Sequence, residues 1–271
     1  MGRESSIIAG GEDVFSRRGV WILDPRWLSH LSAAGIVLAL ALALEVAVRS
    51  GLIASFLLPA PSAVLASILM LLDEEQLLRR FAMTAGEVLA GAGSGMIIGV
   101  VLGWLLHRGR LIRLVFMGWV IGLAAAPLIL LYPLFLVFFG RGLATIVAMS
   151  AVAAVTPIIL KTCEGLDAAR QVLIDVGRSF DLSPARLFWR IRVPSAMPSI
   201  LSGIRLGLAY ALVGVIGVEY LTNFGGLGEL IADLADRYEM AAMYCSILFV
   251  MLVSASFLAA IERLERWLTR G

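Results

Sequence analysis

Long runs of apolar residues, each almost free of charge, are the feature that most restricts how this chain can fold. Several of these windows extend for about 18 residues or more, the length that a helix needs to cross roughly 30 Å of hydrocarbon. The composition agrees, because 60% of the residues are apolar and only 15% are charged. A soluble domain has nearly half apolar residues and about 25% charged ones. The chain is therefore predicted to be an all-α, polytopic membrane protein.

Six apolar runs are long enough to be transmembrane spans, and we expect each to form one helix. They cover residues 31–48, 86–106, 114–139, 143–160, 200–221 and 241–261. Residues 1–28 contain four arginines and no apolar core of signal-peptide length. They are interpreted as a cytoplasmic tail that precedes a transmembrane domain at residues 29–271.

The apolar segment 52–72 is interpreted as an interfacial helix. Pro59 and Pro61 suit the first turn of a helix. The apolar run that follows them ends at Asp73 after about 11 residues, well short of the ~20 that a span needs. A seventh span is the alternative interpretation.

The distribution of basic residues gives the chain an orientation. With the N-terminus inside and six crossings, the cytoplasmic parts are the tail, the turn at 107–113, the stretch 161–205 and the C-terminus. They hold most of the 22 lysines and arginines, as the positive-inside rule predicts. The basic residues left outside are Arg49, Arg79, Arg80, Arg141 and Arg237. The net charge is only +2, and no basic patch indicates a nucleic-acid partner.

The largest cytoplasmic loop contains "FDLSPARLFWRIRVP", residues 180–194, which predicts a helix, a turn and a second helix. In the first helix, 167–180, Val172, Val176 and Phe180 are spaced four apart and form an apolar stripe. Ser183 before Pro184 is typical of a helix start, with the hydroxyl as the cap. Pro194 is expected to end the second helix, because a residue before proline is disfavoured in helical geometry.

The longer stretch "DVGRSFDLSPARLFWRIRVPSAMPSILSGIR" resembles the cytoplasmic loop of ATP-binding-cassette (ABC) importer permeases. The family pattern is Glu-Ala-Ala, three residues, Gly, nine residues, Ile, any residue and Leu-Pro. The residues at the corresponding places are Asp175, Val176, Gly177, Asp181, Ile191, Val193 and Pro194. Only Ile191 and Pro194 are strict matches. "LLPAPSAVLASI", "APLILLYPLFLVFFGRG" and "NFGGLGELI" resemble the nitrate, sulfonate and taurine branch of this family.

This resemblance implies the type I importer permease fold, with six transmembrane helices, an interfacial helix and a cytoplasmic coupling helix in the loop 161–198. The chain would be the transmembrane subunit of an ATP-driven importer in the bacterial inner membrane. Its implied partners are two ATPase subunits, a second permease copy (a homodimer), a periplasmic or lipid-anchored binding protein, a small-molecule substrate and membrane lipid. The residues implied to form the ATPase-coupling site are Asp175, Gly177, Arg178, Phe180, Asp181, Leu182, Ser183, Leu187, Ile191 and Pro194.

Asp181 stands where the family has glycine, which permits a left-handed turn. Aspartate enters that region at a modest cost, so Asp181 is expected to keep the turn. The alternative is that it changes the surface that the ATPase contacts.

No motif in the chain predicts an enzyme. The sequence has no phosphate-binding Gly-x-x-x-x-Gly-Lys-Ser/Thr loop, and its one lysine is Lys161. ATP and Mg²⁺ are expected to be bound by the partner ATPase, and no cofactor by this chain. Cys163 and Cys245 are far apart and predict neither a disulfide framework nor a zinc site. No catalytic residue and no metal ligand is predicted.

Two acidic residues stand out inside the apolar runs, where a charge is costly. Glu45 lies four residues before Arg49 and is interpreted as a structural ion pair. Glu219 is a candidate for the translocation path or a brace of the external gate loop. Tyr132 is a second path candidate, because it lies between Pro127 and Pro133, and prolines in a span mark a kink near a cavity.

The sequence therefore predicts a permease subunit that carries a small solute, an organic or inorganic anion by resemblance to this branch. The alternatives are a secondary transporter, which would show inverted repeats and broken helices around an ion site, and a membrane scaffold without an ATPase partner. The identity of the substrate is beyond these residues.

Overall fold

The structure, a computed structural model, describes residues 25–269 of the chain and the side chains of residues 32–267. Every regular element in this range is a helix. Residues 1–24, which make up most of the predicted cytoplasmic tail, lie outside the described residues. The chain divides into two units, residues 1–53 and 54–271, and each is described by itself.

The first unit contains one described helix, α1 (Pro25–Arg49), which covers the predicted span 31–48. Near its end the guanidinium Nε of Arg49 donates to Glu45 Oε1 at 2.6 Å. This i,i+4 ion pair confirms the structural role expected for Glu45.

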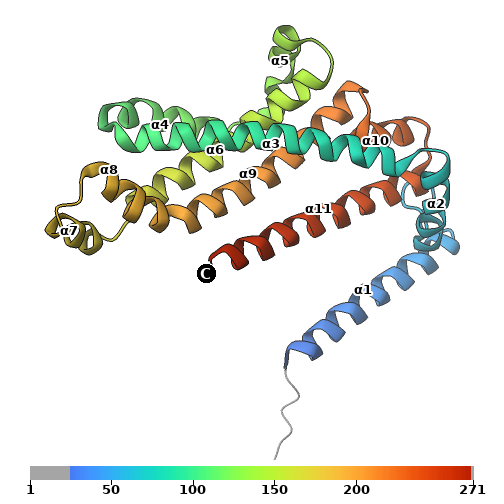
Figure 1. Ribbon diagram of the computed structural model, residues 1–271. Helices are drawn as coiled ribbons and strands as arrows, with labels where there is room; N and C mark the ends of the chain where they lie inside the picture. The colour runs from blue at the N-terminus through green and yellow to red at the C-terminus, as the bar shows by residue number, and fades with distance from the viewer. Residues whose placement is uncertain (1–24, 270–271) are drawn as a thin grey trace, which may run out of the picture. The chain divides into compact units, whose positions relative to one another are not determined.

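The second unit is built around three long helices (Figure 1). They are α3 (Leu77–Arg108), α6 (Leu143–Asp167) and α9 (Val193–Thr222). With α1 and α11 (Met240–Thr269), they are the five described helices that are long and apolar enough to cross a membrane. The bent pair formed by α4 (Arg110–Ala125) with η1 (Leu128–Leu131) and α5 (Tyr132–Phe139) gives a sixth span if it is counted as one.

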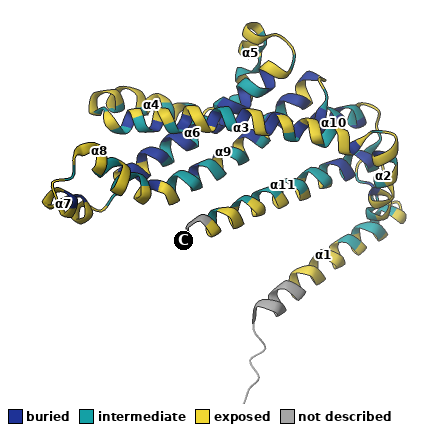
Figure 2. Ribbon diagram, viewed as in Figure 1, coloured by how far each residue is buried: buried dark blue, intermediate teal, exposed yellow. Residues whose placement is uncertain are grey.

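Small residues allow α3 to lie close against α6 of the same chain. A Cβ at Gly95 would lie 2.7 Å from Ala154 Cβ and 2.8 Å from the Ala151 carbonyl oxygen. Gly91, Gly99 and Gly103 face α6 in the same way, and α9 brings Gly207 against Ile158. Close backbone approach is the packing mode that a lipid environment favours. Figure 2 shows buried residues along the facing sides of α3, α6 and α9.

The predicted span 114–139 is not one continuous helix but two helical parts with a sharp bend between them. The chain bends by 100° between α4 and the segment Leu128–Phe139, where α5 projects from the bundle in Figure 1. Pro127 accounts for the position of the break, because proline disfavours helical geometry at the residue before it. Ala126 is accordingly extended, with φ −73° and ψ 140°.

This unit has a second hydrophobic core, at the end where α3 begins. It joins α2 (Pro61–Asp73) and the start of α3 to α10 (Gly226–Asp236) and α11. Its buried members are Val64, Leu71, Leu77, Leu227, Leu230, Leu234, Ala242 and Cys245. At 13 residues α2 is too short to span, which leaves the interfacial interpretation. The sequence reading did not predict α10.

Candidate functional site

The loop between α6 and α9 folds into a compact helical element, which we call the coupling element, residues 171–192. It contains α7 (Gln171–Ser179), α8 (Pro184–Leu187) and the π-helical turn η2 (Phe188–Arg192). The predicted first helix began at Asp167, but Asp167 ends α6 and a break at 168–170 separates it from α7.

The outer face of α7 is apolar and open. Val172 and Phe180 are 72% and 77% exposed, and Leu173 and Val176 are also exposed. Asp175 and Arg178, beside this stripe, form an exposed ion pair at 3.4 Å. Exposed apolar side chains in a row are typical of a surface that another protein covers.

Asp181 forms the turn between α7 and α8. Its φ is 51°, in the left-handed region, as the sequence predicted. Two hydrogen bonds close the turn: the Asp181 N–H donates to the Arg178 carbonyl at 2.9 Å, and the Leu182 N–H donates to the Gly177 carbonyl at 3.1 Å. This pattern is a Schellman C-cap, in which a left-handed residue ends the helix.

Gly177 lets the two halves of the coupling element pack together. A Cβ at this position would lie 2.5 Å from Leu187 Cδ2 and 2.8 Å from Ile191 Cδ1. Leu187 and Ile191 are therefore internal contacts of the element, whereas Phe180 points to solvent. The same close approach explains why glycine suits the last Glu-Ala-Ala position here.

The second helix starts as predicted but does not end as predicted. Ser183 is the N-cap of α8, accepting the Arg186 N–H at 3.4 Å, and Pro184 follows at the first helical position. Pro194, however, does not stop the helix. It is the second residue of α9 and comes directly after the π turn η2, where the regular hydrogen-bond ladder of the helix is already interrupted. The π turn η2 precedes it, so residues 184–222 run as one continuous 39-residue helical stretch.

Polar contacts fix this junction to the neighbouring helix ends. Asp167, at the end of α6, accepts hydrogen bonds from His107 Nδ1 at 2.7 Å and from the Arg113 guanidinium. His107 Nε2 accepts from Arg192 Nη1 at 2.8 Å, because a guanidinium can only donate. The last turn of α3, the first turn of α4, the end of α6 and η2 therefore share one network.

Glu219 occupies the far end of α9 and is fully buried. Its Oε1 accepts from the Thr84 hydroxyl of α3 at 2.7 Å, and its Oε2 accepts from the Gly228 N–H of α10 at 2.8 Å. Thr84 Oγ1 also accepts from the Leu227 N–H at 2.9 Å. These bonds tie the first turn of α10 to both long helices.

The sequence reading missed two residues near Glu219. Thr84 could not be recognised from the sequence as a functional residue, because a hydroxyl is common in membrane helices. Glu87 could have been recognised, because it is an acidic residue within the predicted span 86–106. It is 6% exposed, and its Oε2 has no hydrogen-bond partner within the described part of the chain.

Tyr132 lies at the start of α5, just after the bend. It is half-buried and packs against the cluster of Val88, Ile146, Met149, Val215 and Val218. The structure thus gives Tyr132 and Glu219 different partners, and no hydrogen bond joins them in the described part of the chain.

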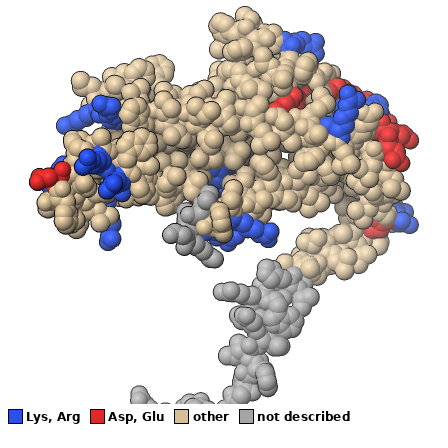
Figure 3. Space-filling view, viewed as in Figure 1, with Lys and Arg blue, Asp and Glu red and all other residues tan. Residues whose placement is uncertain are grey.

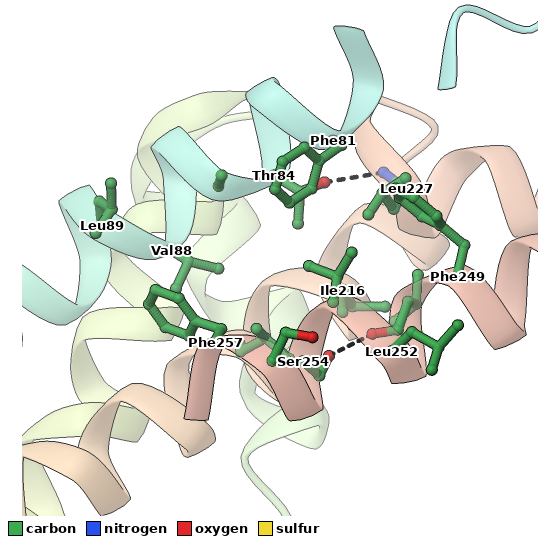
Figure 4. A pocket seen from close by; sticks show the side chains of 15 residues that line it. Phe81, Thr84, Val88, Leu89, Ile216, Leu227, Phe249, Leu252, Ser254 and Phe257 are labelled. Carbon is green, nitrogen blue, oxygen red and sulfur yellow. Dashed lines mark hydrogen bonds between the residues drawn. The ribbon is translucent and has the colours of Figure 1, made fainter. Parts of the chain in front are cut away.

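An apolar cavity of about 610 Å³ opens beside Thr84, between α3, α9, α10 and α11. Phe81, Val88, Ile216 and Phe257 point into it in Figure 4, which also draws the Leu227 N–H bonded to Thr84. Its walls offer almost no polar groups to a charged solute.

A further ion network lies at the same end as α10. Arg237 Nη1 donates to Glu75 Oε1 at 2.8 Å, and Arg80 lies between Glu75 and Glu229 at 3.7 and 3.8 Å. The hydrogen bond with Glu75 raises the pKa of Arg237 above its usual value.

A multi-spanning helical bundle with a compact element between its fourth and fifth spans is the architecture of type I ABC importer permeases. A chain of the MetNI methionine ABC transporter superposes with a TM-score of 0.62 at 20% identity, over 70% of this chain and 94% of that one. An amino acid ABC transporter gives 0.61 at 16% identity, over 75% and 97%. These likenesses concern the fold.

Residues 95–270 match the family of binding-protein-dependent transport system inner membrane components, and the chain belongs to that family. A Haemophilus influenzae protein named "Probable ABC transporter permease protein" is 26% identical, covering 88% of this chain and 95% of the relative. The Escherichia coli taurine transport system permease protein TauC is 23% identical, covering 80% and 81%. The formylaminopyrimidine transport permease protein ThiX of Halalkalibacterium halodurans is 24% identical, covering 78% and 84%.

The chain is thus the transmembrane subunit of an ABC importer, a multi-pass protein of the inner membrane, as the resemblance implied. Permeases of this family work with an ATPase and a substrate-binding protein and are not themselves enzymes.

Proposed function

We propose that two copies of this chain form the translocation path of an importer whose ATP is hydrolysed by two partner ATPase subunits docked on the coupling elements. ATP and Mg²⁺ are bound by those partners, and this chain binds no cofactor. The N-terminus and the coupling element lie in the cytoplasm. The basic residues support this orientation, because at the end that carries the α3–α4 turn and α7 to η2 the Lys and Arg side chains predominate over the acidic ones, whereas at the α10 end basic and acidic side chains are mixed (Figure 3).

The observation that carries the docking role is an exposed apolar stripe on an internally fixed element. Val172, Val176 and Phe180 are open, while Gly177 and Leu187 fasten the element from within. A flexible connector would not keep such side chains in a row. Motion of the ATPases would pass directly into α9, because η2 joins that helix without a loop.

The solute is proposed to be a small anion delivered by an external binding protein. The support is the relatives, one of which is named for taurine, a sulfonate. Tyr132, beside the 100° bend, remains the path candidate. Glu219 is instead proposed to brace α10, since its carboxylate is enclosed and already accepts two hydrogen bonds in this structure.

Phe180→Ala tests the docking surface. Truncating a docked phenylalanine removes about 1.5–3 kcal/mol of apolar burial, so the ATPase should bind roughly tenfold or more weakly. The measurement is the affinity of the purified ATPase for the permease in nanodiscs, with ATP-driven uptake in vesicles alongside.

Leu111→Ala is the matched control, because Leu111 is 79% exposed on α4 near the same end but lies outside the coupling element. It should leave both measurements unchanged. Equal ATPase affinity for the wild type and Phe180→Ala would reject the docking surface, and uptake without ATP or an ATPase would favour a secondary transporter.

A further inference from the structure

A second cavity, of about 660 Å³, lies between the last turn of α3 and the coupling element. Its apolar walls include the rings of Trp104, Phe188 and Trp189. Phe188 lies between the two indoles, with ring centroids 6.5 Å from Trp104 and 5.5 Å from Trp189. Arg108 and Arg192 supply positive charge to the same space.

Within the described part of the chain, neither of these arginines is paired with a carboxylate. Arg192 donates to His107 Nε2, and that ring is neutral in this arrangement because its other nitrogen donates to Asp167. Arg108 lies over the Trp104 ring, with Cζ 5.6 Å from the centroid. Among the side chains of residues 32–267, no carboxylate oxygen lies within ion-pair distance of either guanidinium.

The cavity lies at the end of α3, a helix long and apolar enough to cross a membrane. The outer face of α3 just before it is apolar and exposed, at Val101 and Leu105. Trp104 and Arg108 then follow, and tryptophan and arginine are the residues that mark the level of the lipid headgroups. The site therefore offers cations beside an exposed apolar helix face, the combination that is expected at the depth of the lipid headgroups.

We propose that this cavity binds the phosphate headgroup of an anionic phospholipid from the leaflet on the coupling side. Arg108 and Arg192 would contact the phosphate oxygens, and the acyl chains would follow the exposed face of α3. Basic pockets between membrane helices are a recurrent site for such lipids. The bound lipid would join the end of α3 to η2, the turn from which α9 begins.

The aromatic walls favour a lipid over a free anion. Inorganic phosphate would use the two guanidinium groups but leave the rings of Phe188 and Trp189 in contact with water. A phospholipid satisfies the charge and covers the apolar wall together.

The test uses the permease–ATPase complex, stripped of lipid in a neutral detergent and titrated with phosphatidylglycerol. Bound lipid is counted by native mass spectrometry, with phosphatidylcholine as the neutral comparison. Removing one cation from a headgroup contact weakens binding about fivefold. Arg108→Gln and Arg192→Gln should each do so for the tightest phosphatidylglycerol, and Arg192→Lys should retain binding.

The variants are chosen so that each is expected to fold like the wild type. Glutamine at 192 can still donate to His107, and the Arg108 side chain lies over the Trp104 ring without an ion pair to a described carboxylate. Arg190→Gln is the matched control, since Arg190 is exposed on the same turn but does not line the cavity. It should bind phosphatidylglycerol as the wild type does.

Three results would overturn the proposal. The first is unchanged phosphatidylglycerol binding in both glutamine variants. The second is displacement of the lipid by millimolar inorganic phosphate, which would assign the site to a free anion. The third is a site present in the isolated permease but absent in the complex, which would mean that the ATPase fills the cavity. The lipid count is independent of the Phe180→Ala affinity, so either proposal can fail without the other.

Discussion

Replacement of Asp181 separates two explanations of an aspartate at the family's glycine position. In the structure Asp181 has a φ of 51° and ends α7 through two backbone hydrogen bonds. Among the residues that the structure describes, none forms a hydrogen bond or an ion pair with its side chain. If the role of Asp181 is to form the backbone turn, the effect of each substitution depends on how well the new residue adopts a positive φ. If its carboxylate contacts the ATPase, the effect depends on whether the negative charge is kept.

The turn explanation gives definite magnitudes. A left-handed conformation costs an ordinary residue about 1–2 kcal/mol and costs glycine nothing. Asp181→Gly relieves part of that cost but loosens the unfolded chain, so the two effects nearly cancel. Asp181→Val places a β-branched residue at φ 51° and should destabilise the element by about 1–2 kcal/mol, more if a capping hydrogen bond of ~1 kcal/mol is lost.

The assay is uptake and ATPase activity in vesicles that contain the complete importer. Glycine and asparagine at 181 should both retain coupled transport, because asparagine tolerates the left-handed region and lacks the charge. Valine should lower the uptake per ATP hydrolysed about tenfold. A severe loss in the glycine and asparagine variants, with Asp181→Glu active, would refute the turn explanation and show that the carboxylate itself is needed.

Three further changes test other parts of the structure. Gly95→Ala should destabilise the permease by about 1–3 kcal/mol, because its Cβ would meet the Ala151 carbonyl. Gly93→Ala on the same helix is the control, because its Cβ would meet nothing within 4 Å. Equal midpoints of thermal unfolding for the two variants would contradict the packing of α3 against α6. Glu219→Gln leaves one of two buried donors without an acceptor and should cost about 1–3 kcal/mol in thermal stability; an unchanged midpoint would dismiss the brace. A cysteine at Ser183 should react with impermeant thiol reagents only from the cytoplasmic side, and labelling of intact cells from outside would reverse the proposed topology.

Local chemistry in the sequence predicted the coupling element well. Ser183 and Pro184 mark a helix start through capping and a fixed φ, and both effects act within a few residues. Asp181 was expected to be left-handed for the same local reason. Hydropathy also located the long helices, because span length depends only on the thickness of the hydrocarbon.

Features that depend on distant contacts were not predicted. Pro127 and Pro133 predicted a kink in the apolar run 114–139, but not that the chain would turn by 100° there. Pro194 looked like a helix stop, since the π turn before it is invisible in the sequence. The α10 helix is held by hydrogen bonds to Glu219 and Thr84 on two other helices, and no residue within α10 indicates those bonds in the sequence.

The continuity of the helical stretch Pro184–Thr222 gives the protein a long helical arm that no loop interrupts. Its 39 residues extend about 58 Å at ~1.5 Å per residue, and Glu219 lies about 47 Å from Phe188. Tilting that arm by about 5° at the end that carries the coupling element would move Glu219 by roughly 4 Å, which is more than the length of a hydrogen bond. The bond from the Gly228 N–H to Glu219 cannot stretch that far. A tilt of this size must therefore either carry α10 along with the arm or break the hydrogen bond that attaches it. A small rotation at one end of the arm is thus converted at the other end into either retention or complete loss of the contact with α10.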